Sequence, residues 1–240
     1  MLKGLGTLIN CAAIIAAGIL GRIFSKILNK KVQKALVLSS GVSIFFIGLA
    51  GSMQGMLSIS EGTLKSGRTM LLVISLAIGA LIGEIIGIEE GFERFGAYLK
   101  KKTKSDSDQG FIAAFVTTSL TVSIGAMAIV GSMQEGIAGD YSTLALKAVL
   151  DFIVVFVMSA SMGKGATFSF VPVFILQMSI TYLSKLIAPY MTDLAIDYLS
   201  LVGSVLIACI GINLLFDKRV SVANMLPALI VAMAWAYLPL

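Results

Sequence analysis

The chain has 240 residues, of which 58% are hydrophobic, 13% are charged and none is histidine. Its mean hydropathy is +0.97, and because about a quarter of the residues of a soluble domain are charged, the composition indicates a membrane protein. Cys11 and Cys209 both lie in apolar runs, and without histidine they form no zinc site or acid-base dyad. We therefore expect no metal, no cofactor and no enzymatic activity. The net charge of +5 lies in short clusters between apolar runs, which membrane orientation explains better than nucleic-acid binding.

Apolar runs of about 20 residues, the length that crosses the hydrocarbon core of a bilayer, occur eight times. They lie near residues 5–26, 36–57, 69–90, 111–134, 144–162, 168–188, 197–216 and 222–239. The first run ends in Arg22 without a cleavage-like sequence, so we expect a span and not a signal peptide. We predict an all-α polytopic membrane protein with about eight transmembrane helices in a single membrane domain over 1–240. The stretch 163–167 is either a cytoplasmic turn or a break inside a re-entrant segment.

Basic residues in the connections predict the orientation, because cytoplasmic loops carry an excess of Lys and Arg. The connections 22–34 and 91–110 hold five such residues each, so we place both in the cytoplasm. Alternation then places Lys164 and the turn Asp217-Lys218-Arg219 inside, and both termini outside. Thirteen of the eighteen basic residues lie inside in this arrangement.

An internal repeat is predicted from the tetrapeptide Gly-Ser-Met-Gln, which occurs at 51–54 and again at 131–134. Upstream, Ile-Leu-Gly-Arg-Ile at 19–23 aligns with Leu-Ile-Gly-Glu-Ile at 81–85. The two repeat units, 1–60 and 68–140, both start outside and are therefore parallel. The second unit contains the cytoplasmic loop 91–110, expected as a solvated helix and turn, and 141–240 forms a C-terminal four-helix half.

The two Gly-Ser-Met-Gln segments have two interpretations. In the first interpretation, each segment is a helix C-terminus near the outer surface, because glycine commonly ends helices. Alternatively, Gly51 and Gly131 loosen or break their helices, and polar side chains and freed carbonyls line a cavity. We favour the second interpretation, because the same four residues recur at corresponding depths. The expected lining side chains are Ser52, Gln54, Ser132 and Gln134.

Lys147 and Asp151 lie four residues apart in the fifth run, which places both on one face of a helix. Ionisable residues inside a membrane are costly and often mark an ion or substrate pathway. The alternative is a neutralised pair near the outer interface, with Lys147 snorkelling outward. Asp151 is the deeper of the two and is the strongest single candidate for a pathway residue.

Other polar residues and a set of glycines are expected mainly in helix packing. Gly79, Gly83, Gly87 and Gly91 recur at steps of four, which predicts one ridge for the close approach of another helix of this chain or of a second subunit. Polar residues within or at the ends of spans are candidates for the pathway or for contacts between helices: Asn10, Glu84, Thr121, Asn213 and Asn224.

A resemblance to a known family rests on four segments: Gly-Thr-Leu-Ile-Asn at 6–10, the stretch from Met127 to Asp140, Lys147-Ala-Val-Leu-Asp151, and Val-Ala-Asn-Met-Leu-Pro-Ala at 222–228. Together they resemble the YqgA/YdfK-like bacterial membrane proteins, classed as a domain of unknown function. The resemblance implies a multi-pass protein of the bacterial cytoplasmic (inner) membrane, and the family is sometimes labelled as sodium channels or pumps. Its sequences often have Gly-Pro where this chain has Gly125-Ala126, so no proline-dependent kink is expected there.

Two functional hypotheses follow. The first is a channel or transporter for a small solute, a monovalent cation above all, through a polar cavity that both Gly-Ser-Met-Gln segments and Asp151 line. No ATP-binding P-loop is present, so a pump would use a gradient or a partner's ATPase. The second is a scaffold or signalling partner in the lipid bilayer, assembled through the glycine ridge. For either we expect a homo-oligomer, with a dimer favoured.

Overall fold

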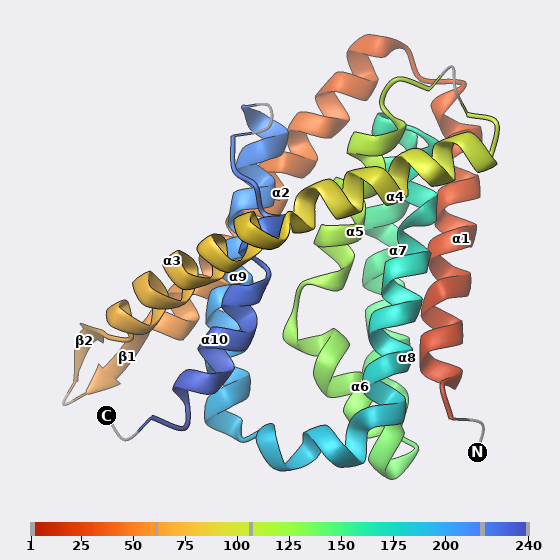
Figure 1. Ribbon diagram of the computed structural model, residues 1–240. Coiled ribbons are helices and arrows are strands. Elements are labelled where there is room, and N and C mark those ends of the chain that lie inside the picture. Colours follow the sequence, from red (N-terminus) through yellow and green to blue (C-terminus); the bar gives the residue numbers. More distant parts are fainter. Residues whose placement is uncertain (1–2, 61, 106–107, 217–218, 239–240) are drawn as a thin grey trace. The chain divides into compact units, whose positions relative to one another are not determined.

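The computed structural model describes residues 3–60, 62–105, 108–216 and 219–238 (Figure 1). The chain divides into two compact units: unit 1 comprises 1–40 and 91–189, and unit 2 comprises 41–90 and 190–240. Each unit therefore contains one copy of Gly-Ser-Met-Gln. The boundaries of the units differ from those of the predicted repeat, and the duplication stays a prediction.

The described residues of unit 1 form helices and the loops that connect them, with no strand. Its elements are α1 (Leu5–Ser25), most of α4 (Ile88–Lys102), α5 (Phe111–Ser123), α6 (Ala126–Ala138), α7 (Ser142–Met162), the 3-10 helix η1 (Lys164–Ser169) and α8 (Phe170–Ile187). Helices α1 and α7 pack side by side (Figure 1). Their approach is close because Gly21 faces the Phe156 carbonyl with no room for a side chain. Ile14, Val155 and Val173 are fully buried in the core between α1, α7 and α8.

The basic segment that was expected to be solvated is partly packed. Helix α4 is amphipathic, and its apolar face lies on α5, where the ring centroids of Phe95 and Phe115 are 5.8 Å apart. Leu99, Phe111 and Phe115 form a small core there. Residues 164–167 belong to the 3-10 helix η1, which follows α7 after Gly163 and leads directly into α8. The cytoplasmic turn and the re-entrant break both stay predictions.

Unit 2 contains the remaining helices and a hairpin. Its elements are most of α2 (Lys30–Met56), β1 (Leu57–Ser60), β2 (Thr63–Ser66), α3 (Thr69–Ile86), the end of η2 (Ala188–Tyr190), α9 (Asp193–Leu215), η3 (Ala223–Met225) and α10 (Pro227–Trp235). The strands pair antiparallel, with Leu57 opposite Ser66. Leu71, Leu201 and Ala228 belong to the core where α3, α9 and α10 meet. The expected turn residues Asp217 and Lys218 lie outside the described residues.

The number of spans is six or seven by length and apolar composition. Six described helices are long enough to cross a membrane, and α5 and α6 together make a seventh, bent by 60° at the break between them. The segment expected as the eighth span, 222–239, contains only a shorter apolar helix over Ala223–Trp235. The all-α polytopic class is confirmed, while eight spans and the location of the termini stay predictions.

The four glycines of the predicted ridge do not lie on one helix. Gly79 and Gly83 are buried and face the backbones of Ala228 and Asn224, where an added Cβ would clash. Gly87 instead ends α3 with a left-handed φ of 70°. Gly91 belongs to the next helix, α4, and faces open space. The spacing thus predicted two packing glycines correctly, and their partner lies in the same chain.

Substitution of these glycines separates packing from helix propensity. Gly83→Ala is expected to destabilise the protein by about 1–3 kcal/mol, as overpacking does, because the new Cβ meets the Asn224 carbonyl. Gly91→Ala has no such neighbour and is expected to stabilise α4 by about 0.5–1 kcal/mol. Thermal unfolding of the detergent-purified variants measures both, and equal effects would contradict the assigned packing.

Candidate functional site

The helix that carries the second Gly-Ser-Met-Gln copy is broken in its middle. Helix α5 ends at Ser123, Ile124 is extended, and Gly125 has φ 148° and ψ 148°, a conformation that essentially only glycine adopts. Helix α6 then starts at Ala126, at 60° to α5 (Figure 1). The break comes one turn or more before Gly131, around which α6 is continuous. A kink therefore exists without the proline of the family pattern.

Lys147 of α7 reaches the backbone at this break. Its Nζ donates to the carbonyl oxygen of Val122 at 2.7 Å, in the last turn of α5. The same Nζ lies 2.7 Å from Oδ1 and 2.6 Å from Oδ2 of Asp151, one turn along α7. Asn10 of α1 donates from Nδ2 to Asp151 Oδ2 at 2.9 Å. Three helices thus supply one buried polar cluster: Asn10, Lys147, Asp151 and the Val122 carbonyl.

The cluster is deeply buried. The side chains of Lys147 and Asp151 are 9% and 7% exposed. The snorkelling alternative for Lys147 is therefore wrong, because its ammonium points to α5 and not outward. An ammonium and a carboxylate in contact neutralise each other, which makes the burial of both tolerable in apolar surroundings. The Val122 carbonyl offers the ammonium a further acceptor.

Residues of the second Gly-Ser-Met-Gln copy are not part of this cluster. Ser132 is fully buried, but its hydroxyl donates to the Ala128 carbonyl of its own helix at 2.6 Å. Gln134 is exposed, and its Oε1 accepts a hydrogen bond of 2.7 Å from the Thr143 hydroxyl. The bond between Gln134 and Thr143 links α6 to the start of α7, while Asp151 has different partners.

The first Gly-Ser-Met-Gln copy lies in unit 2 on an unbroken helix. Ser52 also donates to its own helix, to the Gly48 carbonyl at 2.7 Å. Gly51 faces Ser204 of α9 and allows α2 to approach that helix. Neither Gly51 nor Gly131 breaks its helix, because each is accommodated by a neighbouring helix within a regular turn.

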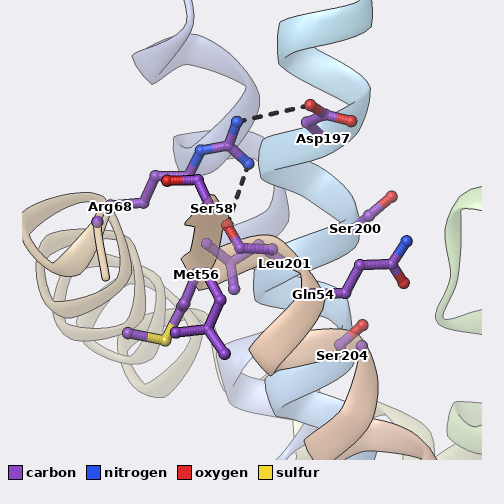
Figure 2. Close-up of a pocket in the computed structure, with 12 residues that line it drawn as sticks. Gln54, Met56, Ser58, Arg68, Asp197, Ser200, Leu201 and Ser204 are labelled. Atoms are coloured by element: carbon purple, nitrogen blue, oxygen red, sulfur yellow. Dashed lines mark hydrogen bonds and ion pairs between the residues drawn. The ribbon is translucent and has the colours of Figure 1, made fainter. Parts of the chain in front are cut away.

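Gln54 lines a cavity of about 540 Å³ in unit 2. Figure 2 shows its amide on the same wall as Ser200 and Ser204 of α9. Across the cavity, Arg68 donates to the Gly55 carbonyl at 3.1 Å and lies 3.6 Å from Asp197 (Figure 2). The cavity is therefore polar, with an amide, the hydroxyls of three serines and one ion pair in its lining.

Arg68 is held in position by several constraints. Its backbone has a left-handed φ of 61° immediately before α3, which is unusual for a residue with a side chain. Its guanidinium carbon lies 5.1 Å from the centre of the Tyr198 ring, a cation–π distance. The guanidinium is thereby fixed at the cavity between α9 and the hairpin.

Gln54 belongs to unit 2, whereas Gln134 and Asp151 belong to unit 1. Each of the three has its own surroundings within its unit. The predicted vestibule that both glutamines share with Asp151 stays a prediction.

The remaining polar candidates have structural partners or face outward. Thr121 donates to the Thr117 carbonyl of its own helix, and Asn224 accepts from the Glu89 backbone at the start of α4. Asn213 closes the turn after α9 through the backbone of Arg219 and Val220. Glu84 is exposed on α3. Of the five candidates, only Asn10 reaches the buried ion pair.

Sequence reasoning missed several buried polar residues of unit 1. Glu135, directly after Gln134, is 2% exposed, and Gln177 in the middle of α8 is 1% exposed. Glu135 was overlooked because it falls in the connection expected between the spans 111–134 and 144–162. A signal was present in α8, where Gln177, Thr181 and Ser184 recur at helical spacing in an otherwise apolar helix, and all three are buried.

Comparison with known proteins places the chain in a family. The model of the family "Protein of unknown function (DUF554)" matches residues 5–237. The chain belongs to this family. It is 30% identical over 233 residues to the uncharacterized protein YqgA of Escherichia coli K12, covering 95% of this chain and 94% of that protein. It is also 30% identical over 226 residues to the uncharacterized membrane protein YdfK of Bacillus subtilis 168, covering 94% and 93%.

No solved structure matches the chain. The resemblance inferred from the four sequence segments is confirmed by the family match and by both relatives. The relatives and the apolar helices together establish a multi-pass membrane protein.

The Lys147–Asp151 pair is expected to be strongly coupled in stability. Lys147→Met or Asp151→Asn alone leaves one buried charge without its partner and is expected to cost about 3–5 kcal/mol. The double variant removes both charges and keeps an acceptor for Asn10, so it is expected to be more stable than either single variant. Chemical denaturation in detergent measures the cycle, with Asp193→Asn at an exposed site as the matched control. Additive effects would contradict the pairing.

Gly125→Ala is expected to destabilise the protein by about 1–3 kcal/mol through backbone strain. The added methyl group meets no atom within 4 Å, so its effect is conformational and not steric. Gly91→Ala is the matched control, because it also enters open space but within a helix. A thermal stability of Gly125→Ala equal to that of the wild type would show that the break does not require glycine.

Proposed function

We propose that the protein is a membrane transporter or channel for a small solute, and that the solute is a monovalent cation. The observation that carries this proposal is the buried ion pair of Lys147 and Asp151 at the break between α5 and α6. In many transport proteins, discontinuous helices provide ion sites because their unwound backbone offers carbonyl oxygens.

The surroundings of the Lys147 ammonium support a cation as the solute. Three oxygen atoms lie 2.6–2.7 Å from Nζ: both carboxylate oxygens of Asp151 and the carbonyl oxygen of Val122. The carbonyl belongs to the C-terminal end of α5, where the helix dipole favours positive charge. The ammonium is in effect a tethered monovalent cation, and a free cation that takes its place meets the same ligands.

Asn10 supports such an exchange. Its amide holds Asp151 Oδ2 from a different helix than the one that carries Lys147. The carboxylate therefore keeps its orientation when the ammonium moves away. Asp151 acts as the charged ligand, Lys147 as the competing cation and Asn10 as a positioning residue.

The polar side chains of the Gly-Ser-Met-Gln segments are not ligands of the proposed cation at Asp151, and we propose lesser roles for them. Gln54 and Gln134 are exposed to surrounding space, and Gln54 lines a polar cavity. Both are candidates for the vestibule. Ser52 and Ser132 bond to their own helices, which favours a packing role for them.

The alternative, a scaffold assembled through the glycine ridge, has less support. Gly79 and Gly83 contact α10 and η3 of the same chain and are not free for a second subunit. A homodimer in the bacterial inner membrane remains part of the proposal, built on other surfaces.

Flux measurements test the proposal. Purified protein in liposomes is expected to carry Na⁺ or K⁺ down an imposed gradient, and Asp151→Asn is expected to lower the rate about tenfold or more. The double variant with Lys147→Met is expected to fold and to remain inactive, which separates function from stability. Gln54→Ala and Gln134→Ala are expected to lower the rate less.

Asp193→Asn serves as the control and is expected to transport like the wild type. Absence of cation flux under every imposed gradient would contradict the proposal. So would wild-type rates in both Asp151→Asn and the folded double variant.

A further inference from the structure

Glu135 is a buried carboxylate of which only one oxygen atom accepts a hydrogen bond. Its side chain lies on α6 and the residue is 2% exposed. Oε1 accepts a hydrogen bond of 2.8 Å from the backbone N–H of Gly6 in the first turn of α1. Oε2 is buried without a hydrogen-bond partner, and no Lys or Arg among the described residues pairs with this carboxylate.

Other buried polar atoms without partners lie on two helices that contact α6, namely α1 and α8. Thr181 of α8 has a buried hydroxyl without a partner, and both polar side-chain atoms of Gln177, one turn earlier, also lack one. Thr7 of α1, next to Gly6, adds a third such residue. All three residues are at most 1% exposed. Buried polar groups are rarely left unpaired in proteins, and a cluster of them calls for a bound ion or water.

Packing contacts bring together the helices that carry these residues. Gly136, adjacent to Glu135, packs directly on the Thr181 carbonyl and the Ser184 side chain, so this part of α6 lies on the polar face of α8. At the other end of the junction, Gly4 lies against Met178, adjacent to Gln177. The start of α1, the end of α6 and the middle of α8 therefore meet around Glu135.

We propose that this junction binds one monovalent cation. The carboxylate of Glu135 supplies one negative charge, and the available amide and hydroxyl oxygens are hard ligands of the kind that alkali cations prefer. A single positive charge neutralises the site, whereas a divalent ion would leave a net charge buried in apolar surroundings. The single negative charge of Glu135 and the neutral oxygen ligands thus favour a monovalent over a divalent cation.

The proposed site lies close to the ion pair along α1. Gly6, which holds Glu135, and Asn10, which holds Asp151, are four residues apart on one face of α1. This spacing is one helical turn, or about 6 Å along the axis. The junction therefore deepens the proposed function, on which its role in transport rests, by giving the cation a second position that is held from the turn of α1 next to the one that holds Asp151.

Cation binding is measured by thermal unfolding of the purified full-length protein in detergent. The chlorides of Li⁺, Na⁺, K⁺ and Rb⁺ are compared with N-methylglucamine chloride at equal ionic strength. At least one alkali cation is expected to raise the Tm in a saturable way, since a ligand that binds the folded state stabilises it. Glu135→Gln is expected to raise the half-saturating concentration at least about tenfold.

Glu90→Gln, at an exposed position in the first turn of α4, is the matched control and is expected to keep the wild-type response. Thr181→Val removes one hydroxyl ligand at nearly constant shape and is expected to weaken the response. This variant decides the question if Glu135→Gln does not fold. The proposal is overturned if no alkali cation differs from N-methylglucamine, if Glu135→Gln responds like the wild type, or if only pH changes the Tm.

Failure of this site and failure of the transport proposal are distinguishable. Cation-dependent stabilisation that requires Glu135 but occurs without flux in liposomes would contradict transport alone. Flux that depends on Asp151 but not on Glu135, without a cation effect on Tm, would contradict the junction site alone.

Discussion

An apolar environment offers no water to backbone groups that a helix leaves unpaired, and this constraint governs unit 1. The break after α5 exposes carbonyl oxygens, and the Lys147 ammonium satisfies that of Val122. A buried ammonium requires a counter-charge, which Asp151 provides, and Asn10 of another helix takes up the carboxylate. The break, the ion pair and the contact of α1 with α7 are therefore one connected arrangement. Removal of any part leaves an unpaired group in apolar surroundings.

The sequence predicted the ion pair better than its setting. The spacing of Lys147 and Asp151 places both on one helical face whatever the fold, so local geometry sufficed. The choice of Asn10 as partner could not be predicted, because it depends on which helices pack together. The position of the break was predicted at Gly131 and found at Gly125. Some glycines let a neighbouring helix approach, and others adopt a φ that is unfavourable for other residues. The sequence shows glycine in both cases, and only the fold distinguishes the two roles.

The same ambiguity explains the glycine ridge. Gly79 and Gly83 were correctly expected to permit close packing, but Gly87 ends the helix in a left-handed conformation. The four-residue spacing of the glycines continues beyond the end of α3, so spacing alone wrongly predicted that Gly87 and Gly91 lie on the same helix. In α8 the opposite error occurred: a polar stripe at helical spacing, from Gln177 to Ser184, was present and not used. In a membrane protein, polar periodicity inside apolar helices is as informative as glycine periodicity, since each polar residue in an apolar span needs a partner.

The buried carboxylates of Asp151 and Glu135 in unit 1 differ in how their charge is balanced. This difference suggests the order in which a cation would occupy them in the proposed pathway. Asp151 already has Lys147 as its counter-ion, so a cation can bind there only by displacing the ammonium. Glu135 has no such partner among the described residues, so a cation can bind there without displacement. A cation at Glu135 would also repel the Lys147 ammonium, because charges interact strongly where water is excluded, and the two carboxylates are held from neighbouring turns of α1. A cation bound at Glu135 would thus favour release of the Lys147 ammonium from Asp151. In the proposed pathway, coupling of this kind would let a cation at Glu135 loosen the Lys147–Asp151 ion pair and so open the way to Asp151.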